Sequence, residues 1–217
     1  MIKNILFDLD GTLLDTNDII INSLRATAKQ FLKRDLSEDE IRSVYGKVLN
    51  DQMLKIAEFV SEELPVDHMV KYYRDAYTKN RTDAHLFPGI NQMLENLKEL
   101  GCNMAIVSSK NRRGLDYCLS EYRLDRFIKY SVAAQDSEKH KPDAQPVLMA
   151  LKQLDGNAEE TVMVGDSKYD IMSGKNAGVK TALVEWTMLP LQELMELKPD
   201  YLLKTPANLV ELVKYPV

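Results

Sequence analysis

The chain has 217 residues, of which 45% are hydrophobic and 28% are charged. This length and composition are typical of a globular protein with one sizeable core, or with a core and a small insert. The formal net charge of −5 leaves no basic excess, so the sequence predicts no binding to duplex nucleic acid, whose phosphates attract basic proteins.

The chain also lacks signals for secretion or membrane insertion. Cys102 and Cys118 are too few for a disulfide framework and are expected to be buried packing residues. The N-terminus turns acidic at Asp8 before any long apolar stretch, which argues against a signal peptide. No run approaches the roughly 18 apolar residues of a membrane-spanning helix. We therefore expect a cytoplasmic protein with no membrane partner; nothing in the sequence decides the oligomeric state.

The first predicted elements are a strand and then a block of helices. Residues 2–9 form an apolar run that is typical of a strand buried on both faces. Residues 16–81 show only helical spacing, and Ser37 and Glu40 form the pattern of a capping box. The first helical stripe consists of Ile20, Leu24, Ala28 and Phe31. The sequence thus predicts a small all-helical unit directly after the first strand.

From residue 87 onward strands and helices alternate. Helices are predicted over 90–100, 111–122, 142–154 and 168–177, strands over 103–108, 130–134, 161–165 and 179–185, and a final strand–helix pair within 201–213. This alternation predicts an α/β fold, a Rossmann-like parallel sheet with helices on both faces. The core would then consist of residues 1–15 and 82–217, with residues 16–81 inserted as a helical cap.

Polar residues are concentrated where the predicted strands end. The four segments are DLDGT at 8–12, SSK at 108–110, KHKPD at 139–143 and GDSKYD at 165–170. Because ligands of open α/β sheets bind at the carboxyl ends of the strands, these segments are expected to meet at one site. Asp8 and Asp10 leave the first strand on the same face, and buried like charges of this kind normally need a cation.

The order DxDGT, a strand ending in Ser, KPD and GDSxxD resembles the haloacid dehalogenase-like hydrolase superfamily over essentially the whole chain. The helical insert is similar to the first cap type of that superfamily. Within it, VGDSKYDIMSGKNAG, EWT at 185–187 and KPDY at 198–201 resemble the branch of phosphoglycolate phosphatases and bacterial pyrophosphatases.

The resemblance implies a role for each aspartate of the first motif. Asp8 would be the nucleophile that forms an aspartyl-phosphate, and Asp10 would protonate the leaving group and then activate water. Asp8, Asp166 and the backbone carbonyl of Asp10 would hold Mg²⁺, the ion that an all-oxygen site meeting a phosphate favours. The hydroxyl of Thr12 would hold Asp10.

The other motifs imply groups that bind phosphate. Ser108, and with less support from the pattern Ser109, would hold phosphoryl oxygens at the start of a helix. Lys141 would offset phosphoryl charge from the loop–helix junction at Pro142, with Lys139 as the competing lysine. Asp170 would bind the metal through water or orient Lys141.

Substrate choice would fall to the cap, because the core recognises only phosphate and metal. Gly46 breaks the helical pattern, and Lys47 beside it could meet an anionic leaving group. The sequence therefore predicts a Mg²⁺-dependent phosphatase of a small phosphorylated metabolite. Phosphoglycolate ranks slightly ahead of pyrophosphate, with sugar-phosphate hydrolysis or phosphomutase chemistry behind. A non-catalytic phosphate-binding module is disfavoured because Asp8, Asp10 and Lys141 are all retained.

Overall fold

The computed structural model describes residues 1–215 and divides the chain into two compact units. One unit consists of Met1–Leu14 and the chain from Leu86 onward; the other is Asp15–His85. The insert thus ends four residues later than the expected boundary at residue 81. A 3₁₀ helix, Arg81–Asp83, directly follows the last helix of the insert, and β3 (His85–Leu86) pairs with β2 (Leu14–Asp15).

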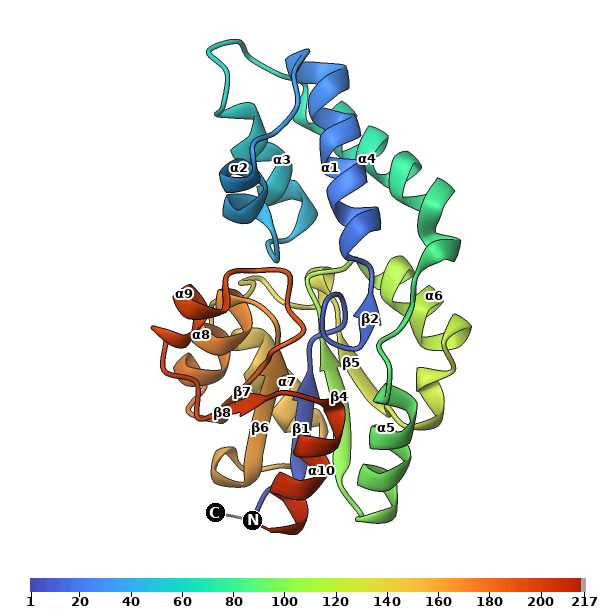
Figure 1. The fold of residues 1–217 in the computed structure, drawn as a ribbon, viewed down its shortest axis with the longest axis vertical. Helices are drawn as coiled ribbons and strands as arrows, with labels where there is room; N and C mark the ends of the chain where they lie inside the picture. The colour runs from blue at the N-terminus through green and yellow to red at the C-terminus, as the bar shows by residue number, and fades with distance from the viewer. Residues whose placement is uncertain (216–217) are drawn as a thin grey trace. The chain divides into compact units, whose positions relative to one another are not determined.

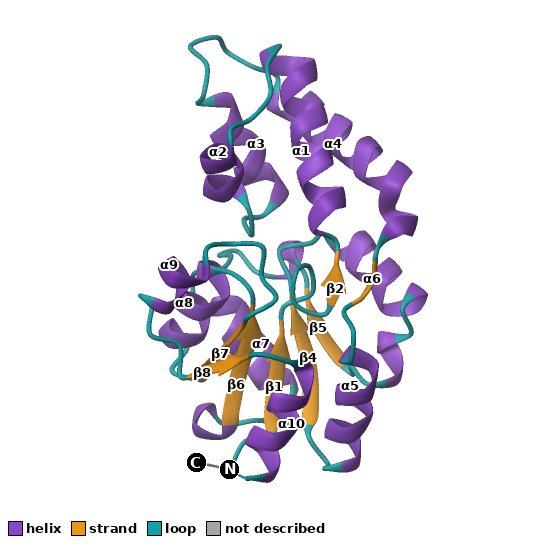
Figure 2. Ribbon diagram, in the orientation of Figure 1, coloured by secondary structure: helices purple, strands orange, loops and turns teal. Residues whose placement is uncertain are grey.

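The first unit contains the predicted parallel sheet. Its strands are β1 (Asn4–Phe7), β4 (Asn103–Val107), β5 (Tyr130–Val132), β6 (Thr161–Gly165), β7 (Lys180–Val184) and β8 (Tyr201–Leu203). They lie in the order β5-β4-β1-β6-β7-β8, and every neighbouring pair is parallel (Figures 1 and 2). This arrangement confirms the predicted α/β fold class. Because β1 lies between β4 and β6, the strand order reverses beside it, where such sheets bind ligands.

Helices of this unit cover both faces of the sheet, as predicted. They are α5 (Ile90–Glu99), α6 (Arg112–Glu121), α7 (Gln145–Gln153), α8 (Lys168–Asn176), α9 (Leu191–Met195) and α10 (Pro206–Lys214). The side chains of β1 alternate between two cores, since Ile5 and Phe7 pack with α5, α6 and α10 while Leu6 packs with α7. A period of two on a strand buried on both faces explains the unbroken apolar run of the sequence.

One predicted helix start is wrong. The helix expected from Pro142 begins only at Gln145, and residues 141–144 form a turn that contains the cis Lys141–Pro142 peptide bond. The backbone amide of Gln145 donates a hydrogen bond to Asp143 Oδ1 at 2.9 Å. Proline is tolerated both in the first turn of a helix and in a β-turn, so its presence does not distinguish a helix start from a turn.

The second unit is helical throughout and contains α1 (Asn17–Leu32), α2 (Glu38–Val44), α3 (Leu49–Ala57) and α4 (Val66–Asn80). Helices α1 and α4 lie side by side (Figure 1). The ring of Phe31 meets that of Tyr72 edge-on, with the centroids 5.8 Å apart. The expected capping box is present, with Ser37 Oγ accepting from Glu40 N and Glu40 Oε2 accepting from Ser37 N. Most of the predicted α1 stripe is buried, namely Ile20, Leu24 and Ala28.

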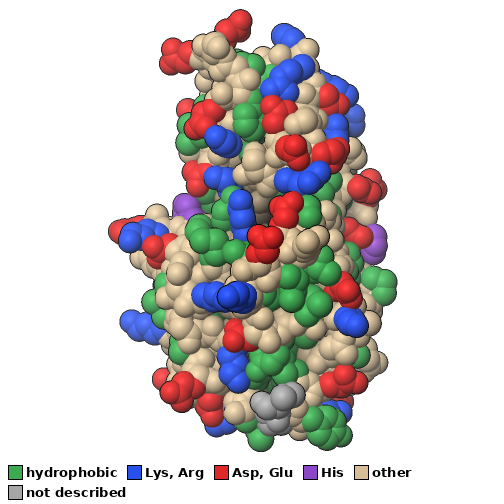
Figure 3. All heavy atoms as spheres, turned by 60° about the vertical axis from the view of Figure 1, so that its left-hand side comes forward, with side chains coloured by type: hydrophobic (Ala, Val, Ile, Leu, Met, Phe, Trp, Pro, Cys, Tyr) green, Lys and Arg blue, Asp and Glu red, His purple; other side chains and the backbone are tan. Residues whose placement is uncertain are grey.

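Among the described residues, no helix is both long and apolar enough to cross a membrane. Basic and acidic side chains are interspersed on the face drawn in Figure 3, rather than gathered in one basic patch.

Candidate active site

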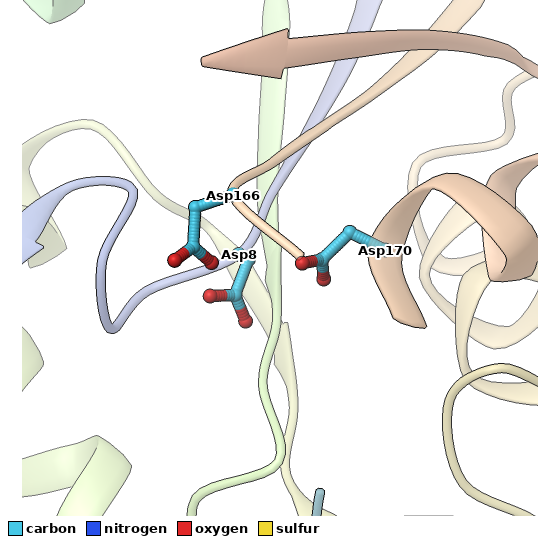
Figure 4. Close-up of side chains that lie close together, drawn as sticks. All are labelled: Asp8, Asp166 and Asp170. Atoms are coloured by element: carbon cyan, nitrogen blue, oxygen red, sulfur yellow. The ribbon is translucent and has the colours of Figure 1, made fainter. Parts of the chain in front are cut away.

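Three aspartates lie together at the carboxyl ends of two neighbouring strands. Asp8 directly follows β1, Asp166 follows β6, and Asp170 stands in the first turn of α8. One carboxylate oxygen of each lies within 4.8 Å of those of the other two (Figure 4). The backbone amide of Asp8 donates to the carbonyl of Val164 at 2.8 Å. This bond continues the pairing of β1 with β6 and fixes Asp8 beside β6.

Lys141 is the cation of this cluster. Its Nζ donates to Asp8 Oδ1 and Asp170 Oδ1, each at 2.6 Å, and to the carbonyl of Val107 at 3.0 Å. Only 4% of the lysine side chain is exposed, so all three donor positions are used away from solvent. The competing Lys139 is 71% exposed and pairs with Asp143 instead. The structure therefore brings Lys141, and not Lys139, to Asp8.

Asp170 orients this lysine. Its Oδ1 accepts from Lys141, while its Oδ2 accepts from the backbone amide of Ser167 at 3.1 Å and from the Ser167 hydroxyl at 2.5 Å. Both carboxylate oxygens therefore already have protein partners. Of the two roles expected for Asp170, the contacts favour orienting Lys141 over binding a metal-bound water.

Gly165 provides the space for Asp170. A Cβ atom at residue 165 would lie 2.2 Å from Asp170 Cβ and 2.3 Å from its Cγ. We expect Gly165→Ala to displace Asp170 from Lys141 and to lower the free energy of unfolding by about 1–3 kcal/mol, the usual cost of overpacking. Urea unfolding and turnover measure the two effects. A variant with wild-type stability and activity would show that Asp170 has room to move without consequence.

Burial strongly affects the protonation of the cluster. For Asp8, desolvation raises the pKa from 3.8 to about 7, against the opposing effect of Lys141. Burial also raises the pKa of Asp166 well above its ordinary value, and the neighbouring Asp170 and Asp8 raise it further. Burial alone would lower the pKa of Lys141, but Asp170 and Asp8 outweigh it and the net shift is upward. Lys141 is therefore a permanent cation at neutral pH.

The cluster fits a divalent cation. Asp166 Oδ2 is buried and has no hydrogen-bond partner among the described residues, a costly state for a carboxylate oxygen unless something binds it. Asp8, Asp10, Asp166 and Asp170 with Lys110 and Lys141 carry a formal charge of −2, which one divalent ion balances. Asp8 and Asp166 are the carboxylates suited to hold it, and oxygen-only ligands favour Mg²⁺.

Asp10 lies apart from this acidic group. Its Oδ2 is 2.9 Å from Lys110 Nζ, and the acidic cluster does not include its carboxylate. This separation is compatible with the expectation that Asp10 would offer a metal its backbone carbonyl and keep its carboxylate for proton transfer. Lys110 was missed by sequence reasoning, because nothing distinguishes it among 28 lysines and arginines except its place after Ser108 and Ser109.

The expected bond between Thr12 and Asp10 is not formed. Thr12 is 1% exposed, and its hydroxyl has no hydrogen-bond partner among the described residues. The contact at this residue is a backbone one instead, since Trp186 Nε1 donates to the Thr12 carbonyl at 3.1 Å. The neighbouring Thr187 donates its hydroxyl to the Asp166 carbonyl at 2.8 Å. Trp186 and Thr187 thus stabilise, by hydrogen bonds to backbone carbonyls, the segment after Asp10 and the segment at Asp166.

The serines predicted to bind phosphate follow β4, the other neighbour of β1. Ser108 is buried, its amide donates to Val132 O at 2.9 Å, and its hydroxyl accepts from Lys110 N at 3.1 Å. Ser109 is half-buried beside it. Asn111 then caps α6 by accepting from Gly114 N. Serine hydroxyls and amides at a helix start are suited to a phosphoryl oxygen.

Gly46 and Lys47 belong to the helical unit, between α2 and α3. Gly46 has a φ of +85°, in the left-handed region that favours glycine. Gln52 Nε2 donates to the Lys47 carbonyl at 2.8 Å and so fixes the turn. The helix-breaking glycine was predicted correctly; the selective role of Lys47 stays a prediction.

Comparison with known proteins agrees with this geometry. The model of the haloacid dehalogenase-like hydrolase family matches residues 5–184. A protein of Caldanaerobacter subterraneus, provisionally named pyrophosphatase PpaX, is 37% identical over 98% of this chain and 95% of its own. The pyrophosphatase PpaX of Bacillus mycoides is 33% identical over 98% of this chain and 97% of its own.

Solved structures show the same fold. A haloacid dehalogenase-like family protein of Streptococcus pneumoniae superimposes with a TM-score of 0.83 at 25% identity, covering 97% of each chain. A protein of Lactobacillus plantarum, provisionally named a phosphoglycolate phosphatase, gives a TM-score of 0.84 at 23% identity, covering 98% of this chain and 99% of its own.

Proposed function

We propose, because the chain belongs to the haloacid dehalogenase-like hydrolase family, that it is a Mg²⁺-dependent phosphatase acting through phosphorylated Asp8. The observation that carries this proposal is the buried contact of Asp8 with Lys141, 2.6 Å long, inside the acidic cluster at the ends of β1 and β6. A carboxylate held beside a fixed cation is suited to attack an anionic phosphoryl group.

The reaction would proceed in two steps, transfer of the phosphoryl group to Asp8 and then its hydrolysis. A carboxylate oxygen of Asp8 forms a bond to phosphorus as the bond to the leaving oxygen breaks, and Asp10 gives its proton to that oxygen. A water molecule then forms the new bond to phosphorus, the bond to Asp8 breaks, and Asp10 takes the proton of the water. Lys141 and the Ser108 hydroxyl would hold phosphoryl oxygens. Mg²⁺ on Asp8 and Asp166, when bound, would neutralise phosphoryl charge.

The substrate we propose is inorganic pyrophosphate, with phosphoglycolate as the second candidate. The sequence alone favours phosphoglycolate slightly, but relatives at 33–37% identity are named as pyrophosphatases, two of them provisionally. Both molecules present a second anionic group beyond the scissile bond, which is the feature that Lys47 would recognise.

A substrate panel tests this order. Purified protein with Mg²⁺ is assayed on pyrophosphate, 2-phosphoglycolate and a phosphate ester whose leaving group is neutral. We expect turnover of pyrophosphate to exceed the others, and Lys47→Ala to reduce turnover of only the two doubly anionic substrates. Lys79→Ala, an exposed lysine of α4, is the matched control. An equal loss on the neutral ester, or no loss, would exclude Lys47 as the selecting residue.

Protons and Mg²⁺ should compete for the site. In the metal-free protein the pKa of Asp8 is about 7 in the folded state and about 4 in the unfolded state. Between these two pH values the folded state keeps a proton on Asp8 that the unfolded state has lost, so folding is linked to proton uptake. This contribution to stability is therefore present below about pH 4 and is lost as the pH rises through about 7. Mg²⁺ binds the ionised carboxylates, so we expect it to raise the melting temperature more at about pH 8 than at about pH 5.

Thermal unfolding with and without Mg²⁺, at constant ionic strength, measures this difference. Asp166→Asn should remove most of the gain at the higher pH. The competition would be refuted by an equal rise in melting temperature at both pH values.

A further inference from the structure

The two aspartates of the first motif have separate lysine partners. Asp8 contacts Lys141, whereas the Oδ2 atom of Asp10 lies 2.9 Å from Lys110 Nζ. The side chains of Lys110 and Asp10 are 11% and 19% exposed. An ion pair so largely withdrawn from solvent is less screened than a surface pair, so its geometry is better defined.

Lys110 is held along its whole length. Its amide donates to Ser108 Oγ at 3.1 Å, and its carbonyl accepts from Ala134 N at 2.9 Å. Its aliphatic stem lies against Gly114 in the first turn of α6, where a Cβ would come within 3.0 Å of the lysine Cγ. The backbone of Lys110 is thus held by hydrogen bonds at both its amide and its carbonyl, and its ammonium group lies against Asp10.

We propose that Lys110 is a positioning residue that holds the Asp10 carboxylate for the hydrolytic step, an inference that rests on the proposed function. Asp10 follows β1 and Lys110 follows β4, so their contact fixes the carboxylate relative to a second strand. In that step the ionised carboxylate takes a proton from water as the water oxygen bonds to phosphorus and the bond to Asp8 breaks. Misplacement of a catalytic group by about 1 Å can cost about 10²-fold in rate.

The test separates this step from the first one. An aryl phosphate with a good leaving group needs no protonation when Asp8 attacks. On 4-nitrophenyl phosphate, Lys110→Met should therefore give a near-wild-type burst of nitrophenol followed by steady turnover about 10- to 100-fold slower. Lys110→Arg should recover much of the steady rate. Arg113→Met, which removes an exposed positive charge from α6, the helix that follows Lys110, should leave both phases unchanged.

A double-variant cycle tests whether Lys110 acts through Asp10. In an Asp10→Asn background, Lys110→Met should slow steady turnover by less than about twofold more, because the group it positions is already lost. A full additional loss would overturn the proposal. So would a slower burst together with weaker inhibition by inorganic phosphate, which would make Lys110 a phosphate ligand.

A structural readout does not depend on turnover. Crystal structures of the wild type and of Lys110→Met should show the Asp10 carboxylate in one position with Lys110 present, and rotated or divided between positions without it. An unchanged Asp10 would overturn the proposal even if the protein proved inactive on every phosphate ester. Failure of the proposed function appears separately, as absence of wild-type turnover.

Discussion

Replacing Asp8 by asparagine is expected to abolish turnover while the protein stays folded. The amide is nearly the same size as the carboxylate but cannot attack phosphorus, so the loss should be at least about 10⁴-fold with every substrate. Asp8 is buried beside Asp166 and Asp170, and the variant replaces one of three crowded carboxyl groups by a neutral amide of similar size. A cooperative thermal transition should therefore remain, measured by circular dichroism on the sample used for kinetics.

The control for this variant is Asp39→Asn, because Asp39 is 92% exposed and lies on α2. It should retain wild-type activity. Mass spectrometry of wild-type protein quenched during turnover should show one added phosphoryl group, which is missing from Asp8→Asn. Substantial activity in Asp8→Asn would exclude an aspartyl-phosphate at this position.

The parallel sheet could be predicted because its signals are local and agree with one another. The apolar run before Asp8 and the alternation after residue 87 each report burial or periodicity directly, and the strand ends follow from them. The motif order alone predicts that Asp8, Ser108 and Asp166 lie at the ends of strands of one sheet. Such positions follow from topology, since parallel strands end at one edge of a sheet.

Pairings between side chains could not be predicted in the same way. Asp10 pairs with Lys110, which lies 100 residues further along the chain, and not with the nearby Thr12. This choice depends on side-chain directions that the sequence does not show. Pro142 does not distinguish a helix start from a turn, because its fixed φ suits both. The need for Gly165 depends on the approach of Asp170, which appears only when α8 packs back on β6.

The largest effect on stability is expected from Lys141→Met. This change keeps most of the side-chain volume but leaves Asp8 and Asp170 without their shared cation in a site where they are 7% and 1% exposed as residues. Removing one partner of a buried ion pair typically costs about 3–5 kcal/mol, because the remaining charge is uncompensated. We expect a loss of this size in urea unfolding, together with loss of turnover.

The matched control is Lys139→Met, two residues earlier in the same loop. Lys139 is 71% exposed and its nearest carboxylate oxygen, on Asp143, is 3.6 Å away, so the unfolding free energy should change by less than about 0.5 kcal/mol. Lowering the pH through about 7 should lessen the cost of Lys141→Met, because protonation of Asp8, whose pKa burial raises to about 7, removes one of the charges that the lysine compensates. A Lys141→Met protein as stable as Lys139→Met at neutral pH would show that the buried lysine does not hold the aspartates together. A stable variant with no turnover would then restrict Lys141 to the phosphoryl group alone.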